Sequence, residues 1–398
     1  MAKFGTVVKN NVQWVGKIDR DLRKFHGGDY DVRHGSTYNA YLIREGKNVL
    51  VDTVWEPYAE EFVENLGKTI PLDEIDYVVM NHGEKDHSGA LPELMKRIPD
   101  VPIYCTANAV KSLKGQYGGE DWNFVTVKTG DTLDVGNGKK LVFVEMRMLH
   151  WPDSMACYLT GDNILFSNDA FGQHYAAEEL FNDLCDSETV LKECMTYYAN
   201  ILSPFSAVAK KKLAEIASLN LDIDIIATSH GVIWRDDPMQ IVGLYEKWCD
   251  RYAEDMISIV YDSMWEGTEK IAKGLAEEIK KISPETEVVL CHLQKMDSNE
   301  IMTNVFRSKS IAVGSPTVVN DVMSSMGGFL HYLKELKFKG KRGAAFGCYG
   351  WSGESTAKIK EGLDKAGFEV IEDEVRCNWN PSEEDRAALA AVAKALTS

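Results

Sequence analysis

Four potential metal ligands lie within six residues of the chain, in the segment His82-Gly83-Glu84-Lys85-Asp86-His87. An apolar stretch at residues 75–80 precedes this segment and a helical pattern follows it, so the four side chains stand where a strand ends. Imidazole nitrogens suit zinc and iron, and the added carboxylates favour a harder ion such as ferric iron. The alternative is a polar strand-to-helix loop in which an acidic or hydroxyl side chain caps the helix.

Three later apolar stretches each bring one further candidate ligand to a strand end. The strands expected at 141–149, 164–166 and 225–229 are followed by His150, Asp169 and His230. A single histidine in such a place is more often structural than a ligand. The recurrence of the pattern in one region nevertheless favours a shared centre of one or two metal ions.

Three loops in the last third of the chain combine hydroxyl groups, glycines and aromatic rings. Hydroxyls and backbone N–H groups at the start of a helix suit a phosphate, and aromatic residues offer faces for a planar ring. Neither the Walker spacing nor G-x-G-x-x-G occurs in the first loop, and each loop alone could be a glycine-rich turn. The candidate binding residues are, loop by loop, Ser263, Met264, Trp265, Gly267 and Thr268; Ser315, Pro316, Thr317 and Asn320; and Gly347, Cys348, Tyr349, Gly350, Trp351, Ser352 and Gly353.

The elements that must position these residues change in character near residue 252. Before it, short runs rich in Val, Ile and Tyr alternate with turns and some helices, which predicts mixed α and β structure with much antiparallel sheet. From residue 256 onward, strand, loop and helix alternate, which predicts a doubly wound parallel sheet. We therefore expect two domains, at residues 1–252 and 253–398, joined by a short connection at 251–255.

The composition bounds the function. The 398 residues carry a net charge of −17, which disfavours binding to nucleic acid or to anionic lipid. No apolar run is long enough for a membrane span and the first residues lack a signal-peptide pattern, so a cytoplasmic protein is expected. None of the eight cysteines form a C-x-x-C pair, which argues against a cysteine-ligated iron or zinc site in this chain.

Taken together, these motifs carry a resemblance to a known family. The pattern His82-x-Glu84-x-Asp86-His87, followed by His150, Asp169 and His230, resembles the metallo-β-lactamase-like fold and, more narrowly, the flavodiiron proteins. The three later loops resemble the FMN-binding loops of flavodoxins. The resemblance implies an N-terminal metallo-β-lactamase-like αββα domain and a C-terminal flavodoxin-like domain. It also implies that Glu84, which replaces the second histidine of the hydrolases' H-x-H-x-D-H motif, marks a diiron centre.

The family pattern also implies individual roles. His82, Glu84 and His150 would hold one iron, Asp86 and His230 the other, and Asp169 would bridge them. His87 binds in some members, and its alternative role is a hydrogen bond to another ligand. The first loop would bind the FMN phosphate, and the second and third would bind the isoalloxazine ring. His26 and Tyr197, with Phe25, match pocket positions that could donate protons or hydrogen bonds, or simply pack.

The resemblance implies a reductase of dioxygen, nitric oxide or both. An external donor such as rubredoxin would supply the electrons through FMN, and a coenzyme F420-type donor is used by some relatives. The family assembles as head-to-tail homodimers or as dimers of such dimers. One rival is a dinuclear metallohydrolase acting on thioesters or phosphoesters, with the flavodoxin domain as a passenger. A second rival is an electron carrier whose metal domain is only a scaffold.

Overall fold

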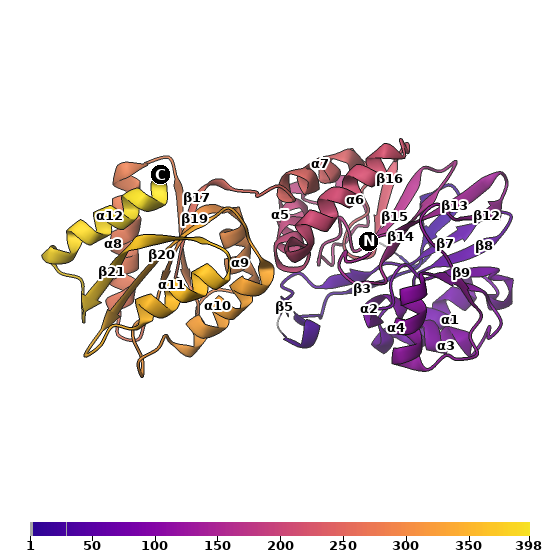
Figure 1. The fold of residues 1–398 in the computed structure, drawn as a ribbon. Coiled ribbons are helices and arrows are strands. Elements are labelled where there is room, and N and C mark those ends of the chain that lie inside the picture. The colour runs from indigo at the N-terminus through magenta and orange to yellow at the C-terminus, as the bar shows by residue number, and fades with distance from the viewer. Residues whose placement is uncertain (1–2, 29) are drawn as a thin grey trace. The chain divides into compact units, whose positions relative to one another are not determined.

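Two compact units make up the protein. The computed structural model describes residues 3–28 and 30–398, and for His26 it describes the backbone alone. The first unit runs to Tyr197 and continues over Phe205–Glu246, and the second comprises Tyr198–Pro204 and Lys247–Ser398. In Figure 1 the first is drawn from indigo to magenta and the second mainly in orange and yellow. The second unit therefore begins before the boundary expected at 252/253 and includes a short earlier segment.

The first unit is built around two β-sheets. The larger has the strand order β1-β2-β7-β8-β9-β10-β11 and the smaller β12-β13-β14-β15-β16, and β3-β6 and β4-β5 form two further two-stranded sheets. The pairs β8-β9, β9-β10, β10-β11 and β15-β16 are parallel and the other pairs are antiparallel. The strands are β1 (Thr6–Lys9), β2 (Val12–Trp14), β3 (Lys17–Asp19), β4 (Lys24–Phe25), β5 (Tyr30–Asp31), β6 (Ser36–Tyr38), β7 (Tyr41–Arg44), β8 (Asn48–Val51), β9 (Tyr77–Val79), β10 (Ile103–Cys105), β11 (Phe124–Thr126), β12 (Thr132–Gly136), β13 (Lys139–Glu145), β14 (Met155–Leu159), β15 (Ile164–Asn168) and β16 (Ile225–Thr228).

Strand residues of the larger sheet alternate between two apolar cores, because successive side chains of a strand point to opposite faces. In β7, Tyr41 and Ile43 join the core between the two sheets, which also contains Phe143 of β13. Leu42 lies between them in sequence and joins the core on the opposite face, where it packs with helical residues such as Phe62. The larger sheet therefore lies between the smaller sheet on one face and a layer of helices on the other, as in a helix–sheet–sheet–helix arrangement.

Helices complete the layers. Residues of α1, α3 and α4 form the core on the outer face of the larger sheet, and α5, α6 and α7 lie beside the smaller sheet (Figure 1). The helices of this part of the chain are α1 (Ala59–Thr69), α2 (Lys85–Ser88), α3 (Leu91–Met95), α4 (Ala107–Tyr117), α5 (Ser187–Tyr197), α6 (Ser206–Ser218) and α7 (Pro238–Trp248).

The second unit is a five-stranded, fully parallel sheet in the order β18-β17-β19-β20-β21. A helix follows each strand. Because all five strands are parallel, their carboxyl ends lie at the same edge of the sheet. On one face, α8 and α12 share a core with the sheet through residues such as Leu275 and Val392. The elements are β17 (Glu254–Tyr261), α8 (Gly267–Ile282), β18 (Glu287–His292), α9 (Ser298–Arg307), β19 (Ser308–Gly314), α10 (Ser324–Leu336), β20 (Arg342–Tyr349), α11 (Ser355–Lys365), β21 (Glu369–Asn378) and α12 (Arg386–Thr397).

The early segment Tyr198–Pro204 is anchored within the second unit by hydrogen bonds. It forms a π-helical turn, Tyr198–Leu202. Asn200 Nδ2 donates to the backbone oxygen of Asn299 at 3.1 Å, and Ser203 Oγ donates to the backbone oxygen of Leu336 at 3.2 Å. These bonds explain why seven residues from between α5 and α6 belong with α9 and α10.

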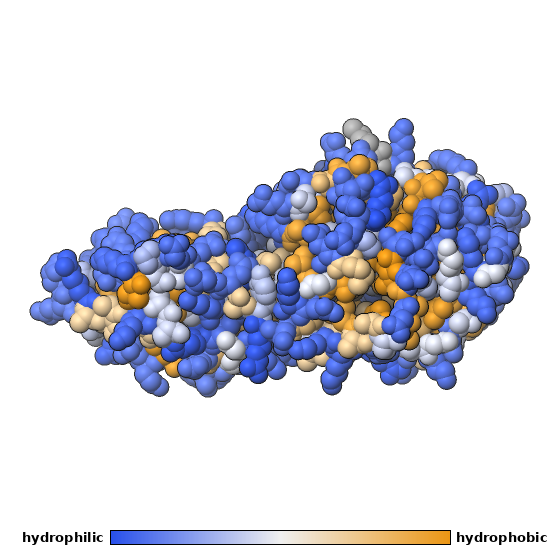
Figure 2. All heavy atoms as spheres, turned by 90° about the horizontal axis from the view of Figure 1, so that it is seen from above, coloured by the Kyte–Doolittle hydropathy of each residue, from blue (hydrophilic) through white to orange (hydrophobic). Residues whose placement is uncertain are grey.

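The surface agrees with the composition. Figure 2 shows hydrophilic residues over most of the visible face, with hydrophobic residues exposed in scattered groups. Within residues 3–28 and 30–398, no helix is both long and apolar enough to cross a membrane.

One expected strand is shorter than its apolar pattern suggested. The pattern at 141–149 predicted a strand that would end at His150, but β13 ends at Glu145 and a loop follows. In this loop Met148 has a left-handed backbone, with φ of 65°. Because such a conformation does not continue a strand, His150 reaches the site from a loop.

Candidate metal centre and flavin-binding loops

The segment after β9 places four candidate ligands around one turn of helix. β9 ends at Val79, His82 lies in the loop that follows, and Glu84 precedes the first residue of α2. Ser88 fixes the turn, since its hydroxyl donates to the backbone oxygens of Gly83 and Glu84 at 2.9 and 2.8 Å. His82, Asp86 and His87 are buried and Glu84 is half-buried.

The smaller sheet and its loops supply the remaining candidates. Asp169 directly follows β15, and His230 comes two residues after the end of β16. The ring of His230 is oriented by a contact of 2.6 Å between its Nδ1 atom and the backbone oxygen of Thr37. His150 is half-buried in the loop after β13, whereas Asp169 and His230 are buried.

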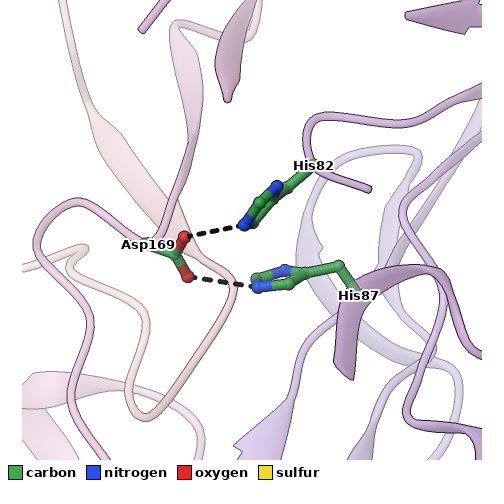
Figure 3. A group of neighbouring side chains, drawn as sticks. All are labelled: His82, His87 and Asp169. Carbon is green, nitrogen blue, oxygen red and sulfur yellow. Dashed lines mark ion pairs between the residues drawn. The ribbon is translucent and has the colours of Figure 1, made fainter. Parts of the chain in front are cut away.

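The seven side chains form three overlapping groups. In each group the ligand atoms lie within 4.8 Å of one another, and the groups are His82, Glu84 and His150; Asp86, His87 and His230; and His82, His87 and Asp169. Figure 3 shows the third group, in which Asp169 points one oxygen toward each of the two imidazoles. The first two groups match the two expected ligand sets, and His87 lies in the second of them.

Asp169 faces each of the two ligand sets with a different carboxylate oxygen. Its Oδ2 atom lies 3.6 Å from His150 Nε2 and 3.9 Å from His82 Nε2. Its Oδ1 atom lies 3.2 Å from His87 Nε2 and 3.5 Å from His230 Nε2 (Figure 3 shows the pairs to His82 and His87). A carboxylate placed in this way can bridge two metal ions, as expected for Asp169.

The electrostatics of this group fit metal ions. Burial opposes the ionisation of Asp169, yet His87 and His230 hold its pKa well below the usual value. Burial likewise opposes charging of His230, but Asp169 and Asp86 raise its pKa. Asp86 Oδ1, His87 Nε2 and Asp169 Oδ2 are buried without a hydrogen-bond partner in the described part of the chain. Buried polar atoms normally have partners, and two cations among these carboxylates and imidazoles would satisfy all three atoms.

The three later loops meet at the carboxyl edge of the parallel sheet. The backbone N–H of Thr317 in the second loop donates to the backbone oxygen of Cys348 in the third, at 2.9 Å. Thr268, at the start of α8 in the first loop, contacts the Cys348 sulfur through its hydroxyl at 3.3 Å. Asn320 Nδ2 in the second loop donates to Ser352 Oγ in the third at 3.3 Å. The loops are therefore joined into one surface.

The predicted flavin contacts differ in exposure. The side chains of Trp265 and Trp351 are 83% and 74% exposed, and Met264 is also exposed. Ser315, Thr317 and Thr268 are buried, as are Pro316, Gly267 and Gly347. The arrangement offers small hydroxyl and backbone groups inside and large aromatic faces outside, which suits a phosphate ester that carries a planar ring.

Comparison with known proteins supports both halves of the chain. Residues 37–231 match the family described as ODP family beta lactamase, and residues 259–391 match flavodoxin. An anaerobic nitric oxide reductase flavorubredoxin of Escherichia coli is 52% identical over 378 residues, which cover 95% of this chain and 79% of that protein. The rubredoxin oxygen:oxidoreductase of Desulfovibrio gigas superposes with a TM-score of 0.95 at 34% identity, covering 98% of this chain and 97% of that one. The flavodiiron protein of Giardia intestinalis gives a TM-score of 0.93 at 33% identity, covering 100% and 96%.

This chain is a flavodiiron protein. The assignment and the two fold classes predicted from sequence are thereby confirmed. The same flavodiiron fold explains why the metal candidates come from loops of two sheets while the flavin candidates come from one edge of a third.

Of the three residues expected to line the metal pocket, the structure describes the side chains of Phe25 and Tyr197. The Tyr197 hydroxyl donates to Asp169 Oδ1 at 3.3 Å, and burial together with Asp169 raises the Tyr197 pKa well above 10. Tyr197 therefore stays protonated as a donor beside the proposed bridge. The side chain of His26 lies outside the described part, so its expected role stays a prediction. The Phe25 ring packs edge-on against Trp55, with centroids 6.3 Å apart.

Two residues at these sites were missed from sequence. His174 is buried against Tyr197 and His230, with ring centroids 5.1 and 5.2 Å away, and its Nδ1 atom lies 2.8 Å from Ser36 Oγ. Trp379 follows β21 and is 63% exposed. Its ring packs on Gly350, where an added Cβ atom would come within 2.7 Å of it. The signals available in the sequence were a polar residue in the loop after a strand, for His174, and an aromatic residue in a loop, for Trp379.

Proposed function

We propose that this flavodiiron protein reduces dioxygen to water, nitric oxide to nitrous oxide, or both, with electrons delivered through FMN. The observation that carries the proposal is Asp169, whose two oxygens face two separate ligand sets in a chain that also has three joined flavin loops. When bound, two irons and FMN supply the redox chemistry: four electrons reduce one O2 to two waters, and two electrons reduce two NO to N2O and water.

The side chains of the metal centre have distinct tasks in this proposal. His82, Glu84 and His150 would hold one ion, Asp86, His87 and His230 would hold the other, and Asp169 could contribute an oxygen to each. Five of these seven residues are buried, and Glu84 and His150 are half-buried, which limits access of bulk water. The Tyr197 hydroxyl, protonated and within reach of Asp169, donates a hydrogen bond toward the ligands of the centre.

The flavin loops complete the proposal. The first loop and the start of α8 bind the phosphate through Ser263, Thr268 and backbone N–H groups. The second and third loops, with the exposed ring of Trp351, hold the isoalloxazine.

The rival hydrolase reading is less well supported. Glu84 stands where the hydrolases have a histidine, and it lies 3.3 Å from His82 and 3.6 Å from His150 as a member of the first ligand set. A third carboxylate adds negative charge and an oxygen donor, which stabilise Fe(III) more than Zn(II). The E. coli and D. gigas relatives are named as a nitric oxide reductase and an oxygen oxidoreductase.

The electron donor, the assembly and the location are proposed from the family resemblance. We propose a rubredoxin-type electron donor, since the D. gigas relative is named for rubredoxin, and a head-to-tail homodimer or dimer of dimers in the cytoplasm. In such a dimer, electrons cross from the FMN of one chain to the metal centre of its partner.

Metal analysis tests the function directly. Protein produced in iron-replete cells is expected to hold about two irons per chain, and the reduced protein is expected to consume O2 or NO in stopped-flow mixing. Mainly zinc, with hydrolysis of thioesters or phosphoesters, would favour the hydrolase. Little metal of either kind would favour the electron carrier.

A complementation experiment tests electron transfer between subunits. One chain carries His150→Ala and His230→Ala, and the other carries disrupted flavin loops at Ser315 and Trp351. Each homodimer should be inactive, and the mixed dimer should regain activity at one composite site. Mixed dimers that stay inactive with both cofactors loaded would exclude transfer between subunits.

A further inference from the structure

Asp153 lies behind one of the histidines of the metal centre. Its Oδ1 atom is 2.9 Å from His82 Nδ1, the ring nitrogen that faces away from Glu84 and Asp169. Both side chains are almost fully buried. Neither atom has a hydrogen-bond partner elsewhere in the described residues, so this ion-pair contact at 2.9 Å is the one that opposes each of them. A proton on His82 Nδ1 would therefore face the Asp153 carboxylate, which leaves Nε2 free to donate electrons to a metal ion.

The carboxylate of Asp153 is itself held in place. Its Oδ2 atom accepts the backbone N–H of Gly83 at 3.1 Å, and Ser112 on α4 donates a side-chain hydrogen bond to it. The Asp153 backbone oxygen accepts the hydroxyl of Thr106, the residue that caps α4, at 2.9 Å. These contacts fix the carboxylate against both the loop that carries His82 and the helix beside it.

The corresponding contact in the other ligand set is neutral. His230 Nδ1 meets the backbone oxygen of Thr37 at 2.6 Å, so a carbonyl dipole stands where His82 has a carboxylate. A carboxylate acceptor makes an imidazole a stronger donor to a metal than a carbonyl does, because it stabilises positive charge on the ring. The two metal positions are therefore supported unequally.

We propose that Asp153 is a positioning residue that selectively strengthens the metal position formed by His82, Glu84 and His150. It fixes the tautomer and ring orientation of His82 and increases its electron donation, so this position holds its ion more tightly and favours the ferric state. The inference rests on the proposed metal centre but concerns only the difference between its two halves.

The test is stepwise metal removal from Asp153→Asn. Asparagine keeps the size of the side chain but removes the negative charge. Purified iron-loaded protein is dialysed against a chelator, and iron and FMN per chain are followed over time. We expect one iron per chain to leave about 10–100-fold faster than in the wild type. The second iron and FMN should leave at wild-type rates, and the mixed-valent EPR signal should change.

Matched variants keep the test decisive. Asp162→Asn is the control, because Asp162 is equally buried in the same unit but pairs with Lys139 at 2.7 Å, away from the ligands. If Asp153→Asn does not fold, Ser112→Ala, which removes one hydrogen bond to the carboxylate, should show a smaller loss at the same position. Wild-type release of both irons, or equal acceleration of both, would overturn the proposal. Repeating the dialysis with zinc-loaded protein separates this outcome from a failure of the proposed redox function.

Discussion

Substitution of Gly267 by alanine should selectively weaken FMN binding. Gly267 is the first residue of α8, where the phosphate is expected to bind. A Cβ atom at this position would lie 2.3 Å from the backbone oxygen of Trp379 and 2.8 Å from the Cys348 sulfur. Carbon atoms pack at about 3.5 Å or more, so the start of the helix would have to move by about 1 Å. Backbone oxygens cannot swing away as a flexible side chain can.

The magnitude follows from the hydrogen bonds at stake. A hydrogen bond to a charged group contributes about 1.5–3 kcal/mol, and a shift of this size removes at least one bond to the phosphate. Since each 1.4 kcal/mol corresponds to about a tenfold change in affinity, FMN should bind about 10–100-fold more weakly. Metal binding should not change, because Gly267 contacts no metal candidate.

The assay is titration of the flavin-free protein with FMN, followed by quenching of flavin fluorescence. Gly274→Ala is the matched control on the same helix, where an added Cβ atom meets Leu389 at an ordinary 3.4 Å. Alanine in a helix interior is favoured over glycine by about 1 kcal/mol, so this variant should bind FMN normally and unfold at slightly higher urea concentration. Wild-type affinity in Gly267→Ala, or equal losses in both variants, would refute the steric reasoning.

Three further outcomes are expected. His150→Ala should abolish gas reduction in an electrode assay while the flavin absorbance per chain stays unchanged; loss of both would contradict separate sites. Lys341→Met leaves the backbone oxygens of residues 252, 306 and 308 without their buried donor, so the second unit should lose about 3 kcal/mol or more in urea denaturation, and an unchanged midpoint would contradict this. Burial opposes ionisation of Glu254, but Arg307 lowers its pKa. Its stabilising contribution is therefore present above its unfolded pKa and lost as the pH falls through the lower folded value, so Glu254→Gln should flatten the fall of the urea midpoint between about pH 5 and pH 3.

The grouping of the candidate metal ligands was predictable because most of its signal is local in sequence. Four of them lie within six residues, and Asp169 and His230 follow apolar runs that became β15 and β16. The alternation in the last third of the chain likewise predicted the parallel sheet. Apolar runs of strand length that alternate with amphipathic helices, with turn residues between them, are sufficient to indicate that fold.

Other features depend on tertiary neighbours that the sequence around them does not identify. Asp153 lies 71 residues from His82 (153 − 82), and nothing in its own segment shows which side chain it will meet. His174 contacts Ser36, which is even more remote in the chain, 138 residues away. The loop that carries His150 was read as a strand because its apolar residues, such as Met146 and Leu149, are buried without belonging to the sheet.

The hydrogen bonds of the segment Tyr198–Pro204 have a consequence for recombination. Because Asn200 and Ser203 bond to α9 and to the end of α10, the flavodoxin part is not one continuous stretch of sequence. A chimera that exchanges only the stretch after α7 with a relative would unite an inherited Asn200 with a foreign α9. A stable chimera requires both segments of the second unit to be exchanged together. Gene fusion or domain exchange at the junction after α7 alone should therefore give unstable chimeras unless position 200 and its partners match.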